Sequence, residues 1–433
     1  MKKNYSDLSK TLTDELTLSV KKKQGIFFTP KESIVTLSNF LKNVLKHPFQ
    51  TVLEPSCGSC EFIKYFDVTN KDIQITGIEY NPTIYESIKE LSFQNNVQIL
   101  HNDFLAYETD KMFDLILGNP PYFVIKKSDL PDKYHPYIIG RPNIFLAFIL
   151  KSLELLNENG ILAFVLPKSF LNCSYYQKLR EEIYNHYSVK KIIDCSEHQY
   201  LETQQETILL ILKKTSKKIN NERYVLNNDF YLFNTKENII RMKELIQGST
   251  TLHQLGFQVF NGNFVWNQER QYLTNDLNDR RLIYSNDIVD NKLRELNSNE
   301  LDEKWNEMLL KLEEETDNKK RKKLNNKIEK KHCVNDSWEK PACEGPLLII
   351  NRGYGNGGYC FNYALIDLDD LFYLENHVLG IRYDGEISKE ELKEKYTMII
   401  NSFQNQNTKR FIEICMGNNA MNTTELEYLL PIF

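Results

Sequence analysis

A short apolar run that ends in two consecutive prolines constrains the fold of this chain more than any other feature. Residues 115–117 are apolar enough for a buried strand, which stops at Gly118 before the sequence Asn119-Pro120-Pro121-Tyr122. Each proline fixes φ and lacks a backbone donor, so the turn after the strand is stiff. The turn therefore holds the Asn119 amide, the Pro120 carbonyl and the Tyr122 ring together at the carboxyl end of a strand, where ligands bind in open α/β sheets.

The chemistry of this turn suits a planar amino group. The Asn119 side-chain oxygen and the Pro120 carbonyl offer two acceptors for its two hydrogens, and Tyr122 can stack on the ring that carries it. The four residues resemble the motif of the N6-adenine and related amino-methyltransferases, which implies S-adenosylmethionine as the methyl donor. An ordinary strand-to-loop turn with an incidental Pro-Pro is the alternative that the motif alone leaves open.

Length and composition favour a globular protein of two domains. The chain has 433 residues, of which 41% are hydrophobic and 26% charged. Its net charge of -5 is no global signature of nucleic-acid binding. No apolar run approaches a membrane span and the N-terminus has no apolar signal core, so we expect a soluble, cytoplasmic protein with no membrane partner. We also expect no metal site, because Cys57 and Cys60 form the only Cys-x-x-Cys and lie in a small-residue turn.

Residues 51–62 predict a strand, a small-residue turn and a helix start. Ser56 and Gly58 would let the backbone approach a ligand closely, and the acidic Glu54 suits a donor amine rather than a phosphate. A dinucleotide fingerprint would need three spaced glycines. The turn resembles the cofactor loop of S-adenosylmethionine enzymes, although Cys60 stands where a second glycine is common.

Acidic residues follow the next two predicted strands. Glu79 ends an apolar run at residues 75–79, where a carboxylate can accept hydrogen bonds from both ribose hydroxyls. Asp103 could accept from the adenine amino group of the cofactor while Phe104 packs on its ring. The resemblance extends the cofactor site to Tyr80, to Pro121 and to Thr29. Thr29 would cap a helix that has Pro30 at its first position and binds the methionine carboxylate.

The remainder of the first half predicts an α/β fold with a Rossmann-like, mainly parallel sheet and helices on both faces. A lid-like loop spans residues 123–142 and is followed by a helix that ends near Asn159 and Gly160. Strands are predicted at residues 161–166, 191–194 and 207–212, and the last two would form the antiparallel hairpin typical of this methyltransferase class. Between them, Tyr200 falls where γ-class enzymes carry an aromatic residue that stacks on the target base.

The alternation of apolar strands and helices gives way to a polar segment after the first half of the sequence. We therefore assign residues 1–235 to a catalytic domain and 236–433 to an α+β target-recognition domain. Residues 295–331 are highly charged and predict a helix, or a helix pair broken near Asp317 and Asn318. This order of elements resembles the γ-class N6-adenine DNA methyltransferases of restriction–modification systems. The resemblance implies duplex DNA as the substrate and a cognate restriction endonuclease encoded separately.

The expected mechanism is direct methyl transfer to an adenine flipped out of the duplex, with Asn119, Pro120 and Tyr122 as the catalytic residues. It needs no metal and no cysteine nucleophile. An N6-adenine RNA methyltransferase or a protein-glutamine methyltransferase is the alternative, because both also act on a planar NH2 group. A fused nuclease would need a further domain, and a non-catalytic binding subunit would be expected to have lost Asn119 or Tyr122.

Overall fold

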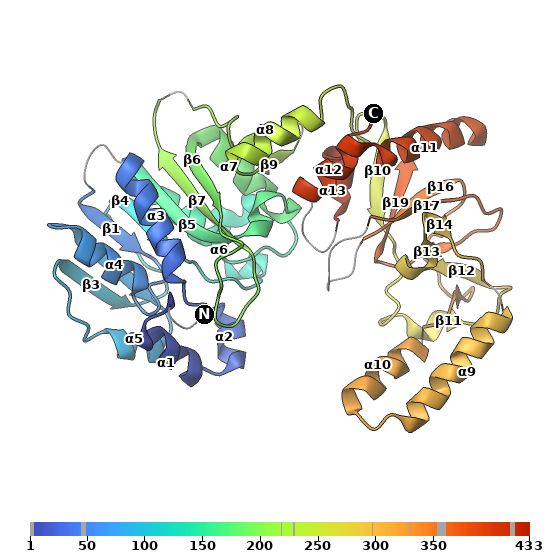
Figure 1. Ribbon diagram of the computed structural model, residues 1–433, viewed down its shortest axis with the longest axis horizontal. Helices are drawn as coiled ribbons and strands as arrows, with labels where there is room; N and C mark the ends of the chain where they lie inside the picture. Colours follow the sequence, from blue (N-terminus) through green and yellow to red (C-terminus); the bar gives the residue numbers. More distant parts are fainter. Residues whose placement is uncertain are drawn as a thin grey trace. The chain divides into compact units, whose positions relative to one another are not determined.

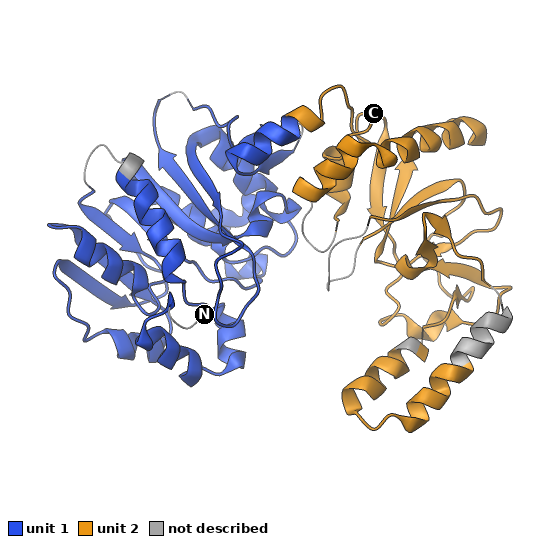
Figure 2. Cartoon of the chain, viewed as in Figure 1, with its two compact units in different colours: residues 1–243 blue, residues 244–433 orange. Residues whose placement is uncertain are grey.

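The computed structural model describes residues 4–44, 49–217, 219–227, 230–296, 298–328, 330–352, 361–415 and 421–433. The chain divides into two compact units, Met1–Lys243 and Glu244–Phe433 (Figure 2). The sequence placed this division after residue 235. In the described part of the chain, no helix is long and apolar enough to cross a membrane.

The first unit is built on one seven-stranded sheet (Figure 1). Its strand order is β3 (Asn96–His101), β2 (Gln74–Glu79), β1 (Thr51–Glu54), β4 (Phe113–Gly118), β5 (Leu156–Pro167), β7 (Thr207–Lys214) and β6 (Tyr187–Asp194). The first five strands pair in parallel, and β7 is antiparallel to both of its neighbours. The predicted α/β fold and its terminal antiparallel hairpin are therefore confirmed.

Side chains alternate between the two faces of this sheet and make two separate cores. On one face, Ile116 and Leu162 pack with α6 (Phe145–Glu154) and α7 (Gln177–His186). On the other, Leu115 and Ala163 pack with α1 (Asp7–Glu15), α3 (Lys31–Val44), α4 (Glu61–Thr69) and α5 (Pro82–Ile88). Because both faces are covered, the central strands are continuously apolar, and polar groups gather at the strand ends.

Two helix boundaries differ from the sequence prediction. The helix after Thr29 begins at Lys31, one residue later than expected. Helix α6 ends at Glu154, and Asn159 and Gly160 lie inside β5 instead of ending the helix. Asn159 has a left-handed φ of 70°, which occurs in strand bulges as well as at helix ends.

The N-terminal residues form two short helices before the sheet begins. Ser6 caps α1 and Thr17 caps α2 (Leu18–Gln24), each by accepting from the backbone N–H three residues on. Gly25 ends α2 with a left-handed φ of 65°, a conformation that glycine adopts without a Cβ penalty. The chain then turns toward the carboxyl edge of the sheet.

The second unit is α+β. One antiparallel sheet contains β10 (Phe257–Asn261), β19 (Val378–Tyr383), β16 (Leu347–Asn351) and β17 (Tyr363–Ile366). A second sheet contains β11 (Leu273–Thr274), β15 (Cys333–Val334), β12 (Arg280–Ile283) and β18 (Tyr373–Leu374). Two hairpins are small: β8 (Val225–Asn227) with β9 (Tyr231–Phe233) in the first unit, and β13 (Ile288–Val289) with β14 (Lys292–Leu293) in the second.

The helices of the second half lie mainly after the sheets. Helix α8 (Lys236–Leu245) spans the division between the units, and α11 (Lys389–Gln404), α12 (Gln406–Cys415) and α13 (Thr423–Tyr428) follow the last strand. The charged segment forms α9 (Ser298–Glu314) and α10 (Asn318–Ile328). The helix pair that the sequence offered as one alternative, broken near Asp317, is thus confirmed.

Candidate active site

A cavity of about 390 Å³ opens at the carboxyl ends of the central strands of the first unit. Its volume lies within the range of small-molecule sites. Eight residues singled out from the sequence line it: Ser56, Gly58, Glu79, Tyr80, Asp103, Phe104, Asn119 and Pro121. They come from the ends of β1, β2, β3 and β4, so the parallel topology brings residues that are distant in the sequence into one cavity.

Glu79 joins the cofactor loop to the end of β2. Its Oε2 accepts from the Gly58 N–H at 2.8 Å, and its Oε1 accepts from the Asn81 N–H at 2.7 Å. Burial raises the pKa of the Glu79 carboxyl, although these backbone donors oppose the shift. The carboxylate therefore holds the loop against the strand and still faces the cavity, where it can accept from a diol.

Asp103 and Phe104 form the adjacent wall. Asp103 is exposed and accepts from the Leu105 N–H at 2.8 Å. The Phe104 ring is buried, 5.0 Å from the Phe148 ring, and the Lys151 ammonium lies 5.3 Å from its centroid. A flat apolar surface beside an outward carboxylate is suited to an aminopurine ring.

The Asn119 amide has one end engaged and one end open. Its Nδ2 donates to the Phe27 carbonyl at 2.9 Å. Its Oδ1 is buried and, among the described residues, has no hydrogen-bond partner. The backbone carbonyl of Asn119 accepts from the Ser56 hydroxyl at 3.2 Å. A buried acceptor without a partner is costly, so Oδ1 keeps an unused acceptor position in a residue that lines the cavity.

Tyr122 is held at both ends of its ring. Its hydroxyl donates to the Val165 carbonyl at 2.8 Å, and its ring packs edge-on to Phe145 with the centroids 6.1 Å apart. Burial, with a smaller contribution from the Tyr200 hydroxyl, holds the pKa of Tyr122 well above its ordinary value. Tyr122 is therefore a neutral, fixed aromatic face. Neither Tyr122 nor the buried Pro120 lines the cavity itself.

Three other residues predicted from the sequence also lie outside the cavity lining: Thr29, Glu54 and Tyr200. Glu54 is buried. It lies close to the end of β4, because a Cβ added to Gly118 would be 3.4 Å from Glu54 Cγ. Tyr200 is only 6% exposed and packs in the core on the α3 face. Their predicted contacts with cofactor or base stay predictions.

Residues 23–27 are a part of the site that the sequence analysis missed. They line the cavity from the N-terminal side, and the Phe27 carbonyl orients the Asn119 amide. A run of lysines such as residues 21–23 is typical of a solvated face, yet Lys21 is buried and pairs with Glu202 at 2.6 Å. The glycine after α2 was the available signal, because Gly25 marks a helix end that turns toward the sheet.

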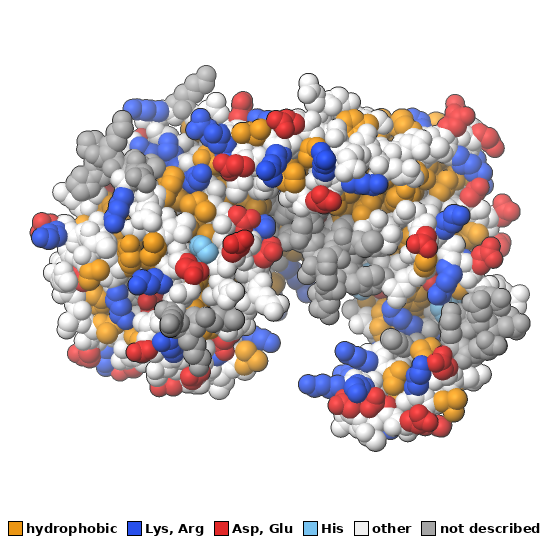
Figure 3. Space-filling view, viewed as in Figure 1, with side chains coloured by type: hydrophobic (Ala, Val, Ile, Leu, Met, Phe, Trp, Pro, Cys, Tyr) orange, Lys and Arg blue, Asp and Glu red, His pale blue; other side chains and the backbone are white. Residues whose placement is uncertain are grey.

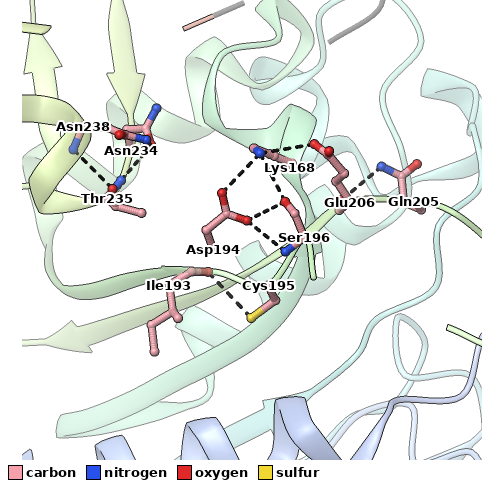
Figure 4. Close-up of polar contacts among 10 residues, drawn as sticks. All are labelled: Lys168, Ile193, Asp194, Cys195, Ser196, Gln205, Glu206, Asn234, Thr235 and Asn238. Carbon is pink, nitrogen blue, oxygen red and sulfur yellow. Dashed lines mark hydrogen bonds and ion pairs between the residues drawn. The ribbon is translucent and has the colours of Figure 1, made fainter. Parts of the chain in front are cut away.

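Lys168 joins the two ends of the loop that carries Tyr200. Its Nζ lies 3.2 Å from Asp194 at the end of β6 and 3.2 Å from Glu206 just before β7 (Figure 4). It also donates to the Ser196 hydroxyl at 3.1 Å. Burial lowers the pKa of Lys168, but the two carboxylates outweigh burial and raise it. The loop at residues 195–206 is thus anchored at its base by one charged side chain.

Cys57 and Cys60 are both buried in the core of the α3 face, and Cys60 has a left-handed φ of 61°. A residue with a Cβ therefore occupies a backbone conformation that favours glycine. Among the described residues, no group of three or more His, Cys, Asp or Glu side chains is placed to hold a metal ion.

Comparison with known proteins relates the first unit to restriction–modification methylases. Residues 15–201 match the family described as Eco57I restriction-modification methylase. The chain is 25% identical to the type II methyltransferase M.CvrRI of Paramecium bursaria Chlorella virus XZ-6E over the full length of both chains. It is 33% identical to the modification methylase CviBIII of Paramecium bursaria Chlorella virus NC1A, over 48% of this chain and 54% of that protein.

Solved structures also align with the chain. The type IIG restriction endonuclease BpuSI aligns with 98% of this chain and 60% of its own, at 12% identity and a TM-score of 0.42. The alignment spans both units.

Proposed function

We propose that this chain, whose residues 15–201 match the restriction–modification methylases, transfers a methyl group from S-adenosylmethionine to N6 of an adenine in duplex DNA. The observation that carries the assignment of an amino group as methyl acceptor is the buried Asn119 Oδ1, which lacks a partner among the described residues, while Nδ2 donates to the Phe27 carbonyl and Asn119 itself lines the cavity. An acceptor fixed in this way is matched by an exocyclic amino group.

The cavity fits the cofactor in the chemistry of its lining. Glu79 would accept from the ribose hydroxyls, Asp103 from the adenine amino group, and Phe104 would pack on the purine, with Ser56, Gly58, Tyr80 and Pro121 around them. When bound, S-adenosylmethionine supplies the electrophilic methyl group.

Asn119 and Pro120 position the base for transfer. Their two oxygens would accept the two N6 hydrogens, and this draws the nitrogen lone pair out of conjugation with the ring. Tyr122 would stack on the adenine and keep N6 in line with the methyl group. As the new N–C bond forms, the bond between the methyl group and the cofactor sulfur would break with its electron pair left on sulfur, and one N6 hydrogen would leave as a proton. Catalysis then depends on orientation and preorganised dipoles. Stacking and hydrogen bonds in the pocket would offset the free energy lost when the base leaves the duplex stack.

The roles of the two units follow as part of this proposal. The first unit would bind cofactor and adenine, and the second, Glu244–Phe433, would read the DNA sequence. We further propose that a separately encoded restriction endonuclease recognises the same sequence. We also propose that the protein acts in the cytoplasm, as the sequence analysis expects.

Methyl transfer from labelled S-adenosylmethionine to duplex DNA, total RNA and total protein tests the substrate class. We expect label in DNA, and an Asn119→Ala variant that is slower by at least about 100-fold, as when a preorganised polar group is lost from an active site, with unchanged cofactor affinity. Asn96→Ala is the matched control, because it makes the same change at the exposed opposite end of the sheet. Glu79→Ala should instead weaken cofactor binding. Label in RNA or protein but not in DNA would refute the proposal.

A further inference from the structure

Helix α10 carries an unusual concentration of one charge. It contains six cationic residues and no acidic one: Lys319, Lys320, Arg321, Lys322, Lys323 and Lys327. The first five are consecutive, and the side chains of these five are exposed. The adjacent α9 is rich in acidic residues. Figure 3 shows the Lys and Arg atoms of this hairpin gathered over α10.

This arrangement opposes the stability of the helix that carries it. The cations occupy the first turns of α10, where the helix dipole favours negative charge. Lys319 lies three and four residues before Lys322 and Lys323, so like charges face one another along the same side. Folding alone gives no reason for five cations in a row at this place.

The acidic neighbours do little to neutralise α10. Among the described residues, Lys320 with Glu315 is the one ion pair that involves an α10 cation, and its separation is 3.9 Å. The Arg321 guanidinium donates to a backbone carbonyl, that of Glu315, at 3.4 Å. Exposed pairs of this kind contribute little. The positive charge of α10 is therefore available to a ligand.

The chemistry of the exposed face favours a polyanion over a protein partner. A protein interface usually has an apolar centre with few lysines, whereas the described exposed side chains of α10 are Asn, Lys and Arg, and its Leu324 and Ile328 are partly buried. The helix is also tied to the body of its unit. Arg270 donates to Asn326 at 3.5 Å, and the Lys330 ammonium lies 5.1 Å from the Trp266 ring just after the helix.

We propose that α10 is a phosphate-contacting element that binds the backbone of duplex DNA. The inference rests on the proposed function for the identity of the nucleic acid. Flexible lysines that meet phosphates strengthen binding without reading bases. The helix would add affinity equally at target and non-target sequences, and sequence choice would remain with other parts of the second unit.

The test compares two quadruple variants of the full-length protein for binding to labelled duplex DNA over a range of salt concentrations. The first is K319Q/K320Q/K322Q/K323Q, in which glutamine keeps the helix propensity. The control is K71Q/K111Q/K217Q/K389Q, which removes four exposed lysines scattered over other elements and so makes the same change in net charge. Far-UV circular dichroism and cofactor affinity verify that both variants are folded.

We expect the α10 variant to bind target and non-target duplexes more weakly by the same factor, at least about tenfold. Its plot of log K against log salt should be shallower by about 0.9 for each DNA phosphate that the variant no longer neutralises. Its kcat at saturating DNA should match the wild type. Equal affinity and slope in the two variants would overturn the inference while methylation by the wild type stands. Failure of the wild type to methylate DNA, with the slopes different as expected, would instead refute the proposed function.

Discussion

At the scale of single residues, Gly25 sets the distance between the N-terminal segment and the turn formed by Asn119-Pro120-Pro121-Tyr122. A Cβ at Gly25 would lie 2.5 Å from the Tyr122 backbone nitrogen and 3.0 Å from its carbonyl carbon. Both are backbone atoms of a stiff turn, which cannot move away without shifting the Tyr122 ring. The residue that ends α2 is therefore coupled to the position of the aromatic face.

Gly25→Ala should for this reason reduce methyl transfer by more than about tenfold and destabilise the fold. Gly248→Ala is the matched control, since Gly248 also has a left-handed φ, of 79°, but nothing lies within 4 Å of its added Cβ. The control carries only the backbone cost of about 1–2 kcal/mol. Steady-state kinetics and urea denaturation measure both effects. Equal losses of activity in the two variants would show that Gly25 acts through backbone strain alone.

The same scale includes a buried acid below the motif. Burial holds the pKa of Glu54 well above its ordinary value of 4.5, and the nearby Glu79 adds to the shift. A raised pKa in the folded state means that the contribution of Glu54 to stability is fully present below pH 4.5 and is lost as the pH rises through the folded value.

Glu54→Gln should remove this pH dependence, because glutamine is neutral at every pH. We expect the variant and the wild type to have similar stability below pH 4.5, the ordinary pKa of the carboxyl. Above it, the variant should gain about 1.4 kcal/mol for each pH unit by which the pKa is raised. Urea denaturation at a series of pH values from about pH 4 to about pH 9 measures the difference. A constant difference over that range would mean that the carboxyl is not perturbed in the folded protein.

At the scale of elements, the N-terminal helices hold the loop at residues 195–206. The Tyr5 hydroxyl donates to the Gln199 carbonyl at 2.9 Å, and the Lys21 ammonium donates to Glu202 at 2.6 Å and to the Thr13 carbonyl at 2.7 Å. With Lys168 at its base, this loop is fixed at both its tip and its ends. The segment before the sheet thus fixes the position of the loop that carries Tyr200.

Lys21→Gln should loosen this attachment. Lys21 is buried and Glu202 is partly exposed, so the loss of stability should fall between the about 0–1 kcal/mol of exposed pairs and the about 3–5 kcal/mol of buried ones. Hydrogen exchange should rise at residues 198–202. Lys22→Gln makes the same change at an exposed neighbour and should leave exchange unaltered. Similar hydrogen exchange in the two variants would mean that Lys21 does not hold the loop at residues 195–206.

Some features of these elements could be predicted from the sequence and others could not. The strand ends at Glu79, Asp103 and Asn119 were predictable because an apolar run that stops at a polar residue is a local pattern. The Phe27 carbonyl was not, because a backbone acceptor has no residue type and Asn119 is 92 positions away. Asn159 and Gly160 predict a helix end because both residue types are common there. The left-handed conformation of Asn159 also occurs in strand bulges, and the sequence alone does not distinguish the two.

At the scale of the whole molecule, the two units have separate hydrophobic cores. All three tryptophans, Trp266, Trp305 and Trp338, belong to the second unit. Tryptophan fluorescence therefore reports the unfolding of the second unit alone, whereas far-UV circular dichroism reports both.

S-adenosylmethionine at about 100 times its Kd should stabilise the first unit by about 2.7 kcal/mol. Thermal unfolding followed by circular dichroism should then shift upward, while the transition seen by tryptophan fluorescence stays where it was. An equal shift in both signals would show that the units unfold as one.

The proposed mechanism depends above all on which atom receives the methyl group, and nucleoside mass spectrometry identifies that atom. Unmethylated genomic DNA is incubated with the protein and S-adenosylmethionine, then digested and analysed. We expect N6-methyldeoxyadenosine with the wild type, formed at least about 100-fold more slowly with Asn119→Ala. Methylation at cytosine C5 would contradict the role assigned to Asn119, Pro120 and Tyr122, and methylation at cytosine N4 would contradict the assignment of adenine as the target base.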